Sequence, residues 1–406
     1  MTQKVLLVCL AFLLCVFGEA GAADSPSEKE LFAAFDHLEK SVGTPSGVPD
    51  AKYLDTLLAF LDNSPAKGTV WEETRKGRGT GVGVAFAVPA SLDRFIQYMY
   101  DPDIPVSAVV PGVVRLVRDA ASMPSGKGAY ARLAAPEGGR ETPIAVRSRY
   151  VMEITPDGNS GAYYGYDQNE LTLLSSRNGR RFLLTASRQT APSDVGKKGY
   201  PVATRDGGTL YCYSGKTGLT KAGLGWVDSY IYTSIAITVY VEAAPGSGSL
   251  KAVSCKWLNA GWMGKNMVRP HHIADGIQRF AEHLGRFLTS PNIPEPQELA
   301  GLVRQIKASG EQGLRAVLGN QLEALVAPDQ KRASMMDRGY VKGLDHEELV
   351  AGILSTHVES LMAGGDPAFL NGLLADSVGS NDPSLLTGRI EPPVSRLPAG
   401  SGPALN

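Results

Sequence analysis

The chain has 406 residues, enough for a large hydrophobic core and for two or three domains. It is 43% hydrophobic and 20% charged, with a formal net charge of −1. Phosphate binding needs clustered lysine and arginine, so this balance argues against a nucleic-acid partner.

Residues 1–22 have the layout of a secretory signal peptide. Lys4 precedes an apolar run over residues 5–17, and small residues follow at positions 20–22. The run is short for a membrane span of about 20 residues. We therefore expect cleavage near Ala22 and a periplasmic or secreted protein, with an uncleaved membrane anchor as the alternative.

Cleavage there would leave two cysteines, Cys212 and Cys255, in an oxidising compartment where disulfides form. Both lie in strand-like runs, two strands apart in a simple meander and therefore about 9–10 Å from each other. That distance is too long for a disulfide unless the sheet bends, so the pairing stays open.

Residues 23–65 carry two helical patterns. Ser27 and Glu30 have the spacing of a capping box at the start of the first, and Asp50 is the expected N-cap of the second. Leucine and phenylalanine recur at helical spacing in both segments. We expect a helical hairpin that packs on the following domain.

Most of the following chain has the alternation of apolar and polar residues that is typical of β-strands. A small apolar run over 81–88 is followed by expected short helices at 91–101 and 111–120, and strand patterns continue from about 129 to 260. Pairs such as Asn178-Gly179 suit tight hairpins because type I′ turns need positive φ at both central residues. Short strands joined by such turns predict an antiparallel meander.

The run over 231–241 has two different faces. Its odd positions form a nearly continuous apolar face that includes Ile235, Ile237 and Val239, whereas its even positions are mixed but sparing in charge. In the next strand Trp257 follows the odd pattern. One face is therefore expected to be dry and the other half covered.

A strongly amphipathic helix is predicted over 270–289. Pro270 suits its first turn, and Ile277, Phe280 and Leu284 fall on one apolar stripe. His272 and His283 are about 16 Å apart on such a helix, too far to hold one ion. No metal ligands, catalytic residues or cofactor-binding loop are predicted from the motifs.

Helical periodicity returns over 291–378, and the tail over 379–406 is rich in proline, glycine and serine, which is typical of disorder.

The order of these elements in residues 66–290 resembles the START and Bet v 1-like (SRPBCC) superfamily. The resemblance is carried by GVGVAFAVPASLDRFIQYMYDPDIP and by SIAITVYVEA with LKAVSCKWLNAGWMGKNMVRPHHIADGIQRFAEHLGRFL. It implies an α+β helix-grip fold, in which a curved antiparallel sheet grips a long C-terminal helix. The N-terminal hairpin and the helices after residue 291 are additions to that pattern.

The resemblance also implies a cavity between sheet and helix that binds a lipid or another hydrophobic small molecule. Its expected wall comprises Ile235, Ile237, Val239, Trp257, Ile277, Phe280 and Leu284. Trp262, Met263 and Met267 are expected at the mouth, and Arg147 and Arg149 are expected to meet a head group. A basic patch of Lys265, Arg269 and His271 could favour an anionic lipid or a membrane surface.

Two other functions stay open at this point. An enzyme of the same fold, such as a cyclase or hydrolase, would need convergent polar groups, with Arg149, Glu153, Tyr164, Asp228 and Glu242 as candidates. Tyr164 is also a candidate ligand contact. A scaffold protein would instead have a filled core and an exposed apolar face on its C-terminal helices.

Overall fold

The computed structural model describes the greater part of the chain. The described residues are 25–44, 47–75, 77–119, 131–133, 135, 142–158, 160–203, 209–221, 225–244, 247–326, 339–365 and 370. The expected signal peptide and the expected disordered tail lie outside them.

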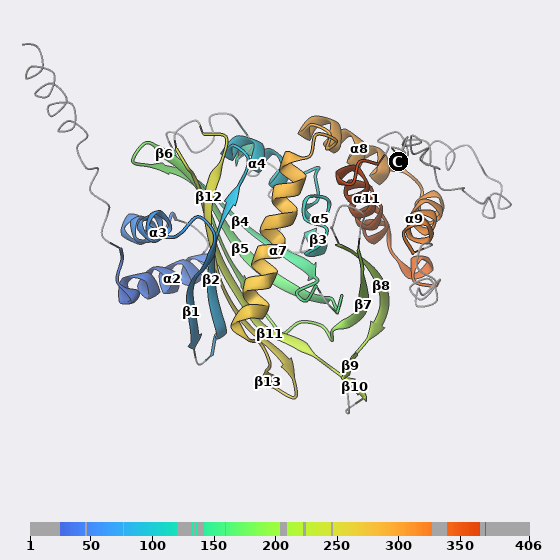
Figure 1. Cartoon of the computed structure of the whole chain (residues 1–406), viewed down its shortest axis with the longest axis horizontal. Helices are drawn as coiled ribbons and strands as arrows, with labels where there is room; N and C mark the ends of the chain where they lie inside the picture. The colour runs from blue at the N-terminus through green and yellow to red at the C-terminus, as the bar shows by residue number, and fades with distance from the viewer. Residues whose placement is uncertain are drawn as a thin grey trace, which may run out of the picture.

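A nine-stranded antiparallel sheet forms the centre of the molecule (Figure 1). Its strand order is β1-β2-β12-β11-β6-β5-β4-β3, and β13 pairs with the end of β12. In that order the strands are β1 Gly68–Arg75, β2 Gly79–Val88, β12 Leu250–Trp262, β11 Tyr230–Glu242, β6 Arg180–Gln189, β5 Tyr164–Arg177, β4 Ile144–Ile154 and β3 Val114–Asp119, with β13 at Lys265–Asn266.

Part of this sheet is the predicted meander. The turn between β5 and β6 has φ of 51° at Asn178 and 75° at Gly179, as the Asn-Gly signal requires. The meander is interrupted, however, by two separate two-stranded sheets. One pairs β7 (Lys197–Ala203) with β8 (Thr209–Thr217), and the other pairs β9 (Leu219–Lys221) with β10 (Gly225–Val227).

This interruption separates the two cysteines. Cys212 lies on β8 and belongs to the core cluster on the α7 side, whereas Cys255 lies on β12 in the cluster on the other side of the sheet. No disulfide joins them. Their separation follows from β8 leaving the main sheet.

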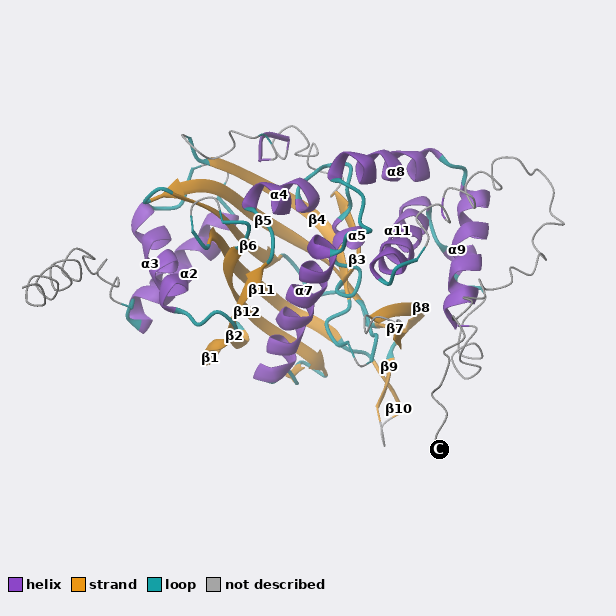
Figure 2. Cartoon of the chain, turned by 45° about the horizontal axis from the view of Figure 1, so that its top comes forward, coloured by secondary structure: helices purple, strands orange, loops and turns teal. Residues whose placement is uncertain are grey.

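Helix α7 (Pro270–Thr289) lies across one face of the sheet (Figures 1 and 2). Pro270 occupies its first turn, and Ile273, Ile277 and Leu284 are buried toward the sheet side. Helix α4 (Leu92–Met99) and the short α5 (Val106–Val109) share the same core cluster. Ser91 caps α4 by accepting a hydrogen bond from the backbone N–H of Arg94 at 3.3 Å.

The opposite face of the sheet is covered by the predicted N-terminal hairpin of α2 (Glu28–Val42) and α3 (Ala51–Asn63). The Ser27–Glu30 capping box is present at the start of α2, and Asp50 is the N-cap residue of α3 without a side-chain hydrogen bond. The hairpin and the odd-numbered face of β11 form one continuous core cluster.

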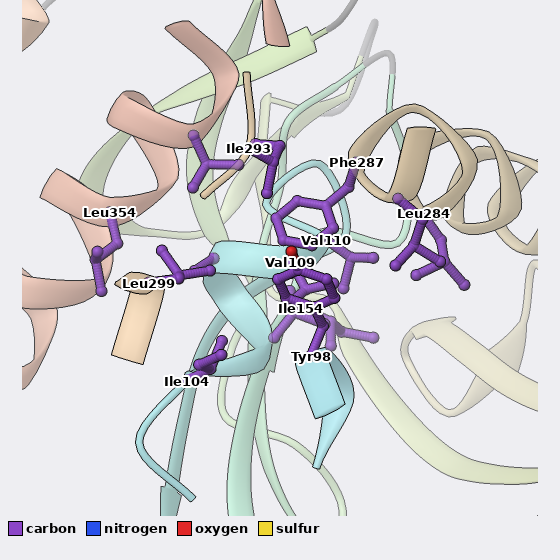
Figure 3. Packing of buried hydrophobic residues seen from close by; sticks show 14 of the residues in the cluster. Tyr98, Ile104, Val109, Val110, Ile154, Leu284, Phe287, Ile293, Leu299 and Leu354 are labelled. Atoms are coloured by element: carbon purple, nitrogen blue, oxygen red, sulfur yellow. The ribbon is translucent and has the colours of Figure 1, made fainter. Parts of the chain in front are cut away.

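The C-terminal helices share the core of the α7 side rather than forming a separate core. They are α8 (Pro296–Ala308), α9 (Glu311–Val326), the 3-10 turn η1 (Val341–Gly343) and α11 (His346–Met362). Figure 3 shows Leu299 and Leu354 packed in one cluster with Val109 and Phe287. The buried Glu359 of α11 accepts a hydrogen bond at 2.8 Å from Arg286 of α7. Within the described ranges, no helix has the length and hydropathy needed to span a bilayer.

The predicted α+β helix-grip class, with added N- and C-terminal helices, is confirmed by this arrangement. The predicted helix over 111–120 is wrong, because this segment forms strand β3 at the sheet edge, with Val117 paired to Met152 of β4. Residues 131–133, expected in a strand region, are helical.

Candidate functional site

A cavity of about 650 Å³ lies between the sheet and α7. Its roof comes from α7 and from residues 99–106 between α4 and α5, and its floor comes from β4, β5, β6, β11 and β12. The volume lies within the range of small-molecule sites in proteins, about 300–1,000 Å³.

The roof of the cavity is largely apolar. Ile273, Ile277 and Phe280 project from α7, and Met99, Ile104 and Val106 come from the α4–α5 segment. Val113, Val114 and Ile154 extend this surface.

The floor carries hydroxyl groups in its middle. Thr185 and Ser187 of β6, Ser234 and Thr238 of β11 and Ser254 of β12 all line the cavity. The hydroxyls of Thr238 and Ser254 are 2.8 Å apart and hydrogen-bonded. These side chains come from alternate residues of each strand and therefore share one face of the sheet.

A half-buried glutamate lies on this floor. The Glu170 carboxylate accepts hydrogen bonds from the hydroxyls of Tyr150 at 2.6 Å and Thr172 at 3.0 Å, and the Gln168 amide donates to the Tyr150 oxygen at 2.8 Å. Burial raises the pKa of Glu170, and the two hydroxyl donors oppose that rise.

A half-buried lysine lies on the same floor. Lys256 of β12 lines the cavity, and burial together with the nearby charge of Arg279 lowers its pKa to about 8. Lys256 remains mostly protonated at neutral pH, because its pKa still lies above 7.

Charged residues from the C-terminal helices reach the cavity wall. Lys307 of α8 and Glu347 of α11 both contribute to the lining. Glu347 accepts a hydrogen bond at 2.7 Å from Arg118 of β3, another lining residue. The additional helices therefore complete one side of the cavity.

Four of the residues predicted from the sequence line the cavity, namely Arg147, Arg149, Ile277 and Phe280. The guanidinium of Arg149 donates to Asp167 at 2.9 Å, so its charge already has a partner. Arg147 also borders the cavity and donates to the backbone carbonyl of Gly47 at 2.8 Å. Ligand contact by these residues stays a prediction.

Ile235, Ile237, Val239 and Trp257 lie on the other face of the sheet. They pack against α2 and α3 in the second core cluster, so the expectation that they line the cavity is corrected. Trp257 is fully buried, and its ring centroid lies 5.0 Å from that of Phe35 in α2. The physical reason is that the apolar face of the central strands packs against the α2–α3 hairpin, and this contact excludes water.

Five further predicted residues are absent from the cavity lining. Leu284 is fully buried in the core under α7, and the Tyr164 hydroxyl hydrogen-bonds that of Ser229 at 2.9 Å. Trp262 and Met267 lie where β12 turns into β13 and beyond it. Met263, at the tip of that turn, is 78% exposed. Trp262, Met263 and Met267 do not line the cavity, so the expectation that they form its mouth is corrected.

None of the polar floor residues, including Glu170 and Lys256, is predicted from the sequence. A signal was present in the pattern. Glu170 and Lys256 each lie in a strand whose side chains alternate between two faces. In both strands the charged residue stands on the half-covered face, at a position where a small or apolar residue is expected. Their relative position depends on strand order and register, which a single sequence does not supply.

The candidates for enzyme chemistry do not converge. Glu153 is buried and pairs with Arg115, which also contacts Glu348 of α11 at 2.9 Å. Tyr164 pairs with Ser229, and neither Glu153 nor Tyr164 belongs to the cavity lining. Among the residues that the structure describes, no three His, Cys, Asp or Glu side chains are grouped as metal ligands.

Comparison with known proteins gives likeness in structure only. No family model matches the chain, and the comparison with curated proteins gave no match. Human STARD10 is similar over 60% of this chain and 83% of its own, with a TM-score of 0.29 and 8% identity. The lipid transfer and protein localization domain of human StarD13 (DLC2) is similar over 59% of this chain and 98% of its own, with a TM-score of 0.25 and 8% identity.

With TM-scores this low, the description of the fold rests on the strand order of this chain and on the position of α7.

Proposed function

We propose that this protein binds a lipid or another hydrophobic small molecule in the cavity between the sheet and α7. The observation that carries the proposal is the cavity itself, about 650 Å³ in volume with an apolar roof. Removing apolar ligand surface from water contributes roughly 25 cal/mol per Å², so binding needs no dedicated catalytic or metal group.

We further propose that the protein acts after export. The support for this is the signal-peptide layout of residues 1–22. Determining the first residues of the protein purified from its own host, together with the cell fraction that holds it, tests export. A mature chain starting near Asp24 in the envelope or medium supports it, and an intact Met1 in the cytosolic fraction contradicts it.

The binding proposal is tested by native mass spectrometry of the protein purified from its host, followed by organic extraction. We expect a bound apolar molecule that Ile277→Arg removes, because the substitution places a charge in the cavity wall. Gln278→Arg is the matched control, since Gln278 is the next residue of α7 and is exposed.

Ala236→Phe provides a second test that adds no charge. Ala236 lines the floor, so the added ring fills part of the cavity and should lower the bound fraction at least severalfold. Binding that survives in both cavity variants, while Gln278→Arg binds equally well, would contradict the proposal. So would an empty protein that takes up nothing from a lipid mixture.

A further inference from the structure

The cavity floor contains a cation that has no anion to match it. Lys256 lines the cavity, and among the residues that the structure describes no carboxylate is paired with its ammonium group. A charge that is partly withdrawn from water and has no partner is costly, so the presence of Lys256 in a ligand cavity calls for an explanation.

The carboxylates that border the cavity are engaged or distant. Strand register places Glu170, Ser187, Ala236 and Lys256 in one row across β5, β6, β11 and β12. Glu170 and Lys256 are thus three strands apart, about 14 Å at ordinary strand spacing. Glu347 is paired with Arg118, and Asp101 accepts the backbone N–H of Asp103 at 2.8 Å.

A second cation lies near Lys256. The Arg279 guanidinium of α7 lines the same cavity and donates to the backbone carbonyls of Thr155 at 2.7 Å and Pro156 at 3.0 Å. Its Nε atom is buried and has no hydrogen-bond acceptor among the described residues. Its charge adds to the effect of burial in lowering the Lys256 pKa. This part of the cavity therefore has a positive potential.

Apolar surface of the roof lies opposite Lys256, and Arg279 extends from the same roof helix. Ile273, Ile277 and Phe280 form the roof over the floor that holds Lys256. A ligand that satisfies both surfaces needs a hydrocarbon body and a compact group that accepts hydrogen bonds from an ammonium.

From this geometry we infer that the ligand is an anionic amphiphile. Its head group, a carboxylate or a phosphate monoester, accepts a hydrogen bond from the Lys256 ammonium, and its hydrocarbon chain lies under α7. The inference rests on the proposed function and adds the chemical class of the ligand.

The test compares ligands that share one chain and differ in the head group. Hexadecanoic acid, hexadecyl phosphate and hexadecan-1-ol are bound to the full-length mature protein by equilibrium dialysis, with inorganic phosphate as a ligand without a chain. The variants are Lys256→Met, which removes the charge at similar length, and Lys256→Arg, which keeps it. Lys251→Met is the matched control, because Lys251 lies on the same strand with its side chain bonded to the backbone carbonyl of Asp62.

We expect the protein to bind the acid or the phosphate ester at least tenfold more tightly than the alcohol. Lys256→Met should weaken binding of the anionic ligands roughly tenfold to a hundredfold, the range for a hydrogen bond to a charged group, and leave the alcohol unchanged. Lys256→Arg and Lys251→Met should keep the preference, and inorganic phosphate should not compete at the same concentrations.

An equal loss for acid and alcohol in Lys256→Met, or no preference in the unmodified protein, would overturn the head-group inference while leaving the proposed function intact. Competition by inorganic phosphate at those concentrations would overturn the amphiphile and indicate a free anion as ligand. Failure of every chain-bearing ligand to bind would overturn both proposals.

Discussion

At the scale of single residues, burial changes the protonation of several side chains in this protein. Glu170 and Lys256 shift in opposite pKa directions but for the same reason, because burial disfavours the charged form of each. His357 of α11 behaves as Lys256 does, for it is only 3% exposed and its pKa falls from an ordinary 6.5 to about 4. The cavity thus combines Glu170, whose pKa is raised, with Lys256, whose pKa falls to about 8.

The His357 shift predicts a loss of stability in mild acid. Between pH 6.5 and pH 4 the unfolded chain takes up a proton at this residue and the folded chain does not, so the free energy of unfolding falls as the pH falls. The contribution over that range is about 3 kcal/mol. Urea unfolding at pH 7.5 and pH 4.5 should show a smaller acid loss in His357→Leu than in the unmodified protein.

His271→Leu is the control for that measurement, because His271 is exposed at the start of α7. Its acid loss should equal that of the unmodified protein. Identical pH dependence in both variants would show that His357 is not held neutral by the fold.

At the scale of elements, the α2–α3 hairpin decides which face of the sheet is dry. The ring of Phe35 in α2 contacts those of Trp71 in β1 and Trp257 in β12, with centroid distances of 5.7 Å and 5.0 Å, and the two tryptophan rings are 5.2 Å apart. The hydroxyl-bearing face of the same strands is left for the cavity. The hairpin therefore contributes to ligand binding indirectly, by fixing the orientation of the central strands.

This role predicts a large effect of Phe35→Ala on stability. Phe35 is 1% exposed, so removal of its ring should lower the free energy of unfolding by about 3–5 kcal/mol. Phe32→Ala is the comparison, since Phe32 is half-buried on the same helix and should cost distinctly less. Equal losses in denaturant titrations would mean that the hairpin is not packed as described.

Local signals predicted the elements well. The capping box at Ser27 and Pro270 at the start of α7 depend on residues three or fewer positions apart. Such signals need no knowledge of the rest of the fold, and each marks a helix that the structure contains.

The faces of β11 could not be assigned in the same way. Alternation shows that Ile235 and Ile237 share a face, but both faces of a central strand can be covered. The choice depended on the hairpin, more than a hundred residues earlier in the chain. Likewise, the apolar spacing of residues 113–117 fits a helix or a strand, and pairing with β4 selected the strand.

At the scale of the whole molecule, one buried ionic cluster joins the sheet to the C-terminal helices. Arg115 of β3 pairs with Glu153 of β4 and with Glu348 of α11, and it donates to the Tyr340 hydroxyl at 2.7 Å. Its guanidinium also lies 4.9 Å from the ring centroid of Tyr163. Through these contacts α11 is held against the sheet edge beside the cavity rim.

Arg115→Met should therefore destabilise the whole protein. The substitution leaves Glu153 and Glu348 without this cation, and breaking a buried pair costs about 3–5 kcal/mol. Adding Glu153→Gln should restore part of the loss in urea unfolding. Arg118→Met on the same strand is the control, because its ion pairs are more exposed and should contribute at most about 1 kcal/mol. A loss for Arg115→Met no larger than that of the control would contradict this account.

The hairpin on the back of the sheet also has a consequence for how the chain reaches its native state. Helix α3 ends at Asn63, whereas β11, against which it packs, begins at Tyr230. At 5–20 residues per second the ribosome needs on the order of ten seconds to make the intervening chain. During that time the apolar stripes of α2 and α3 exist without their partner surface. Docking of the hairpin is thus a late, long-range step, and the newly made N-terminal segment is the part of the protein most in need of a chaperone.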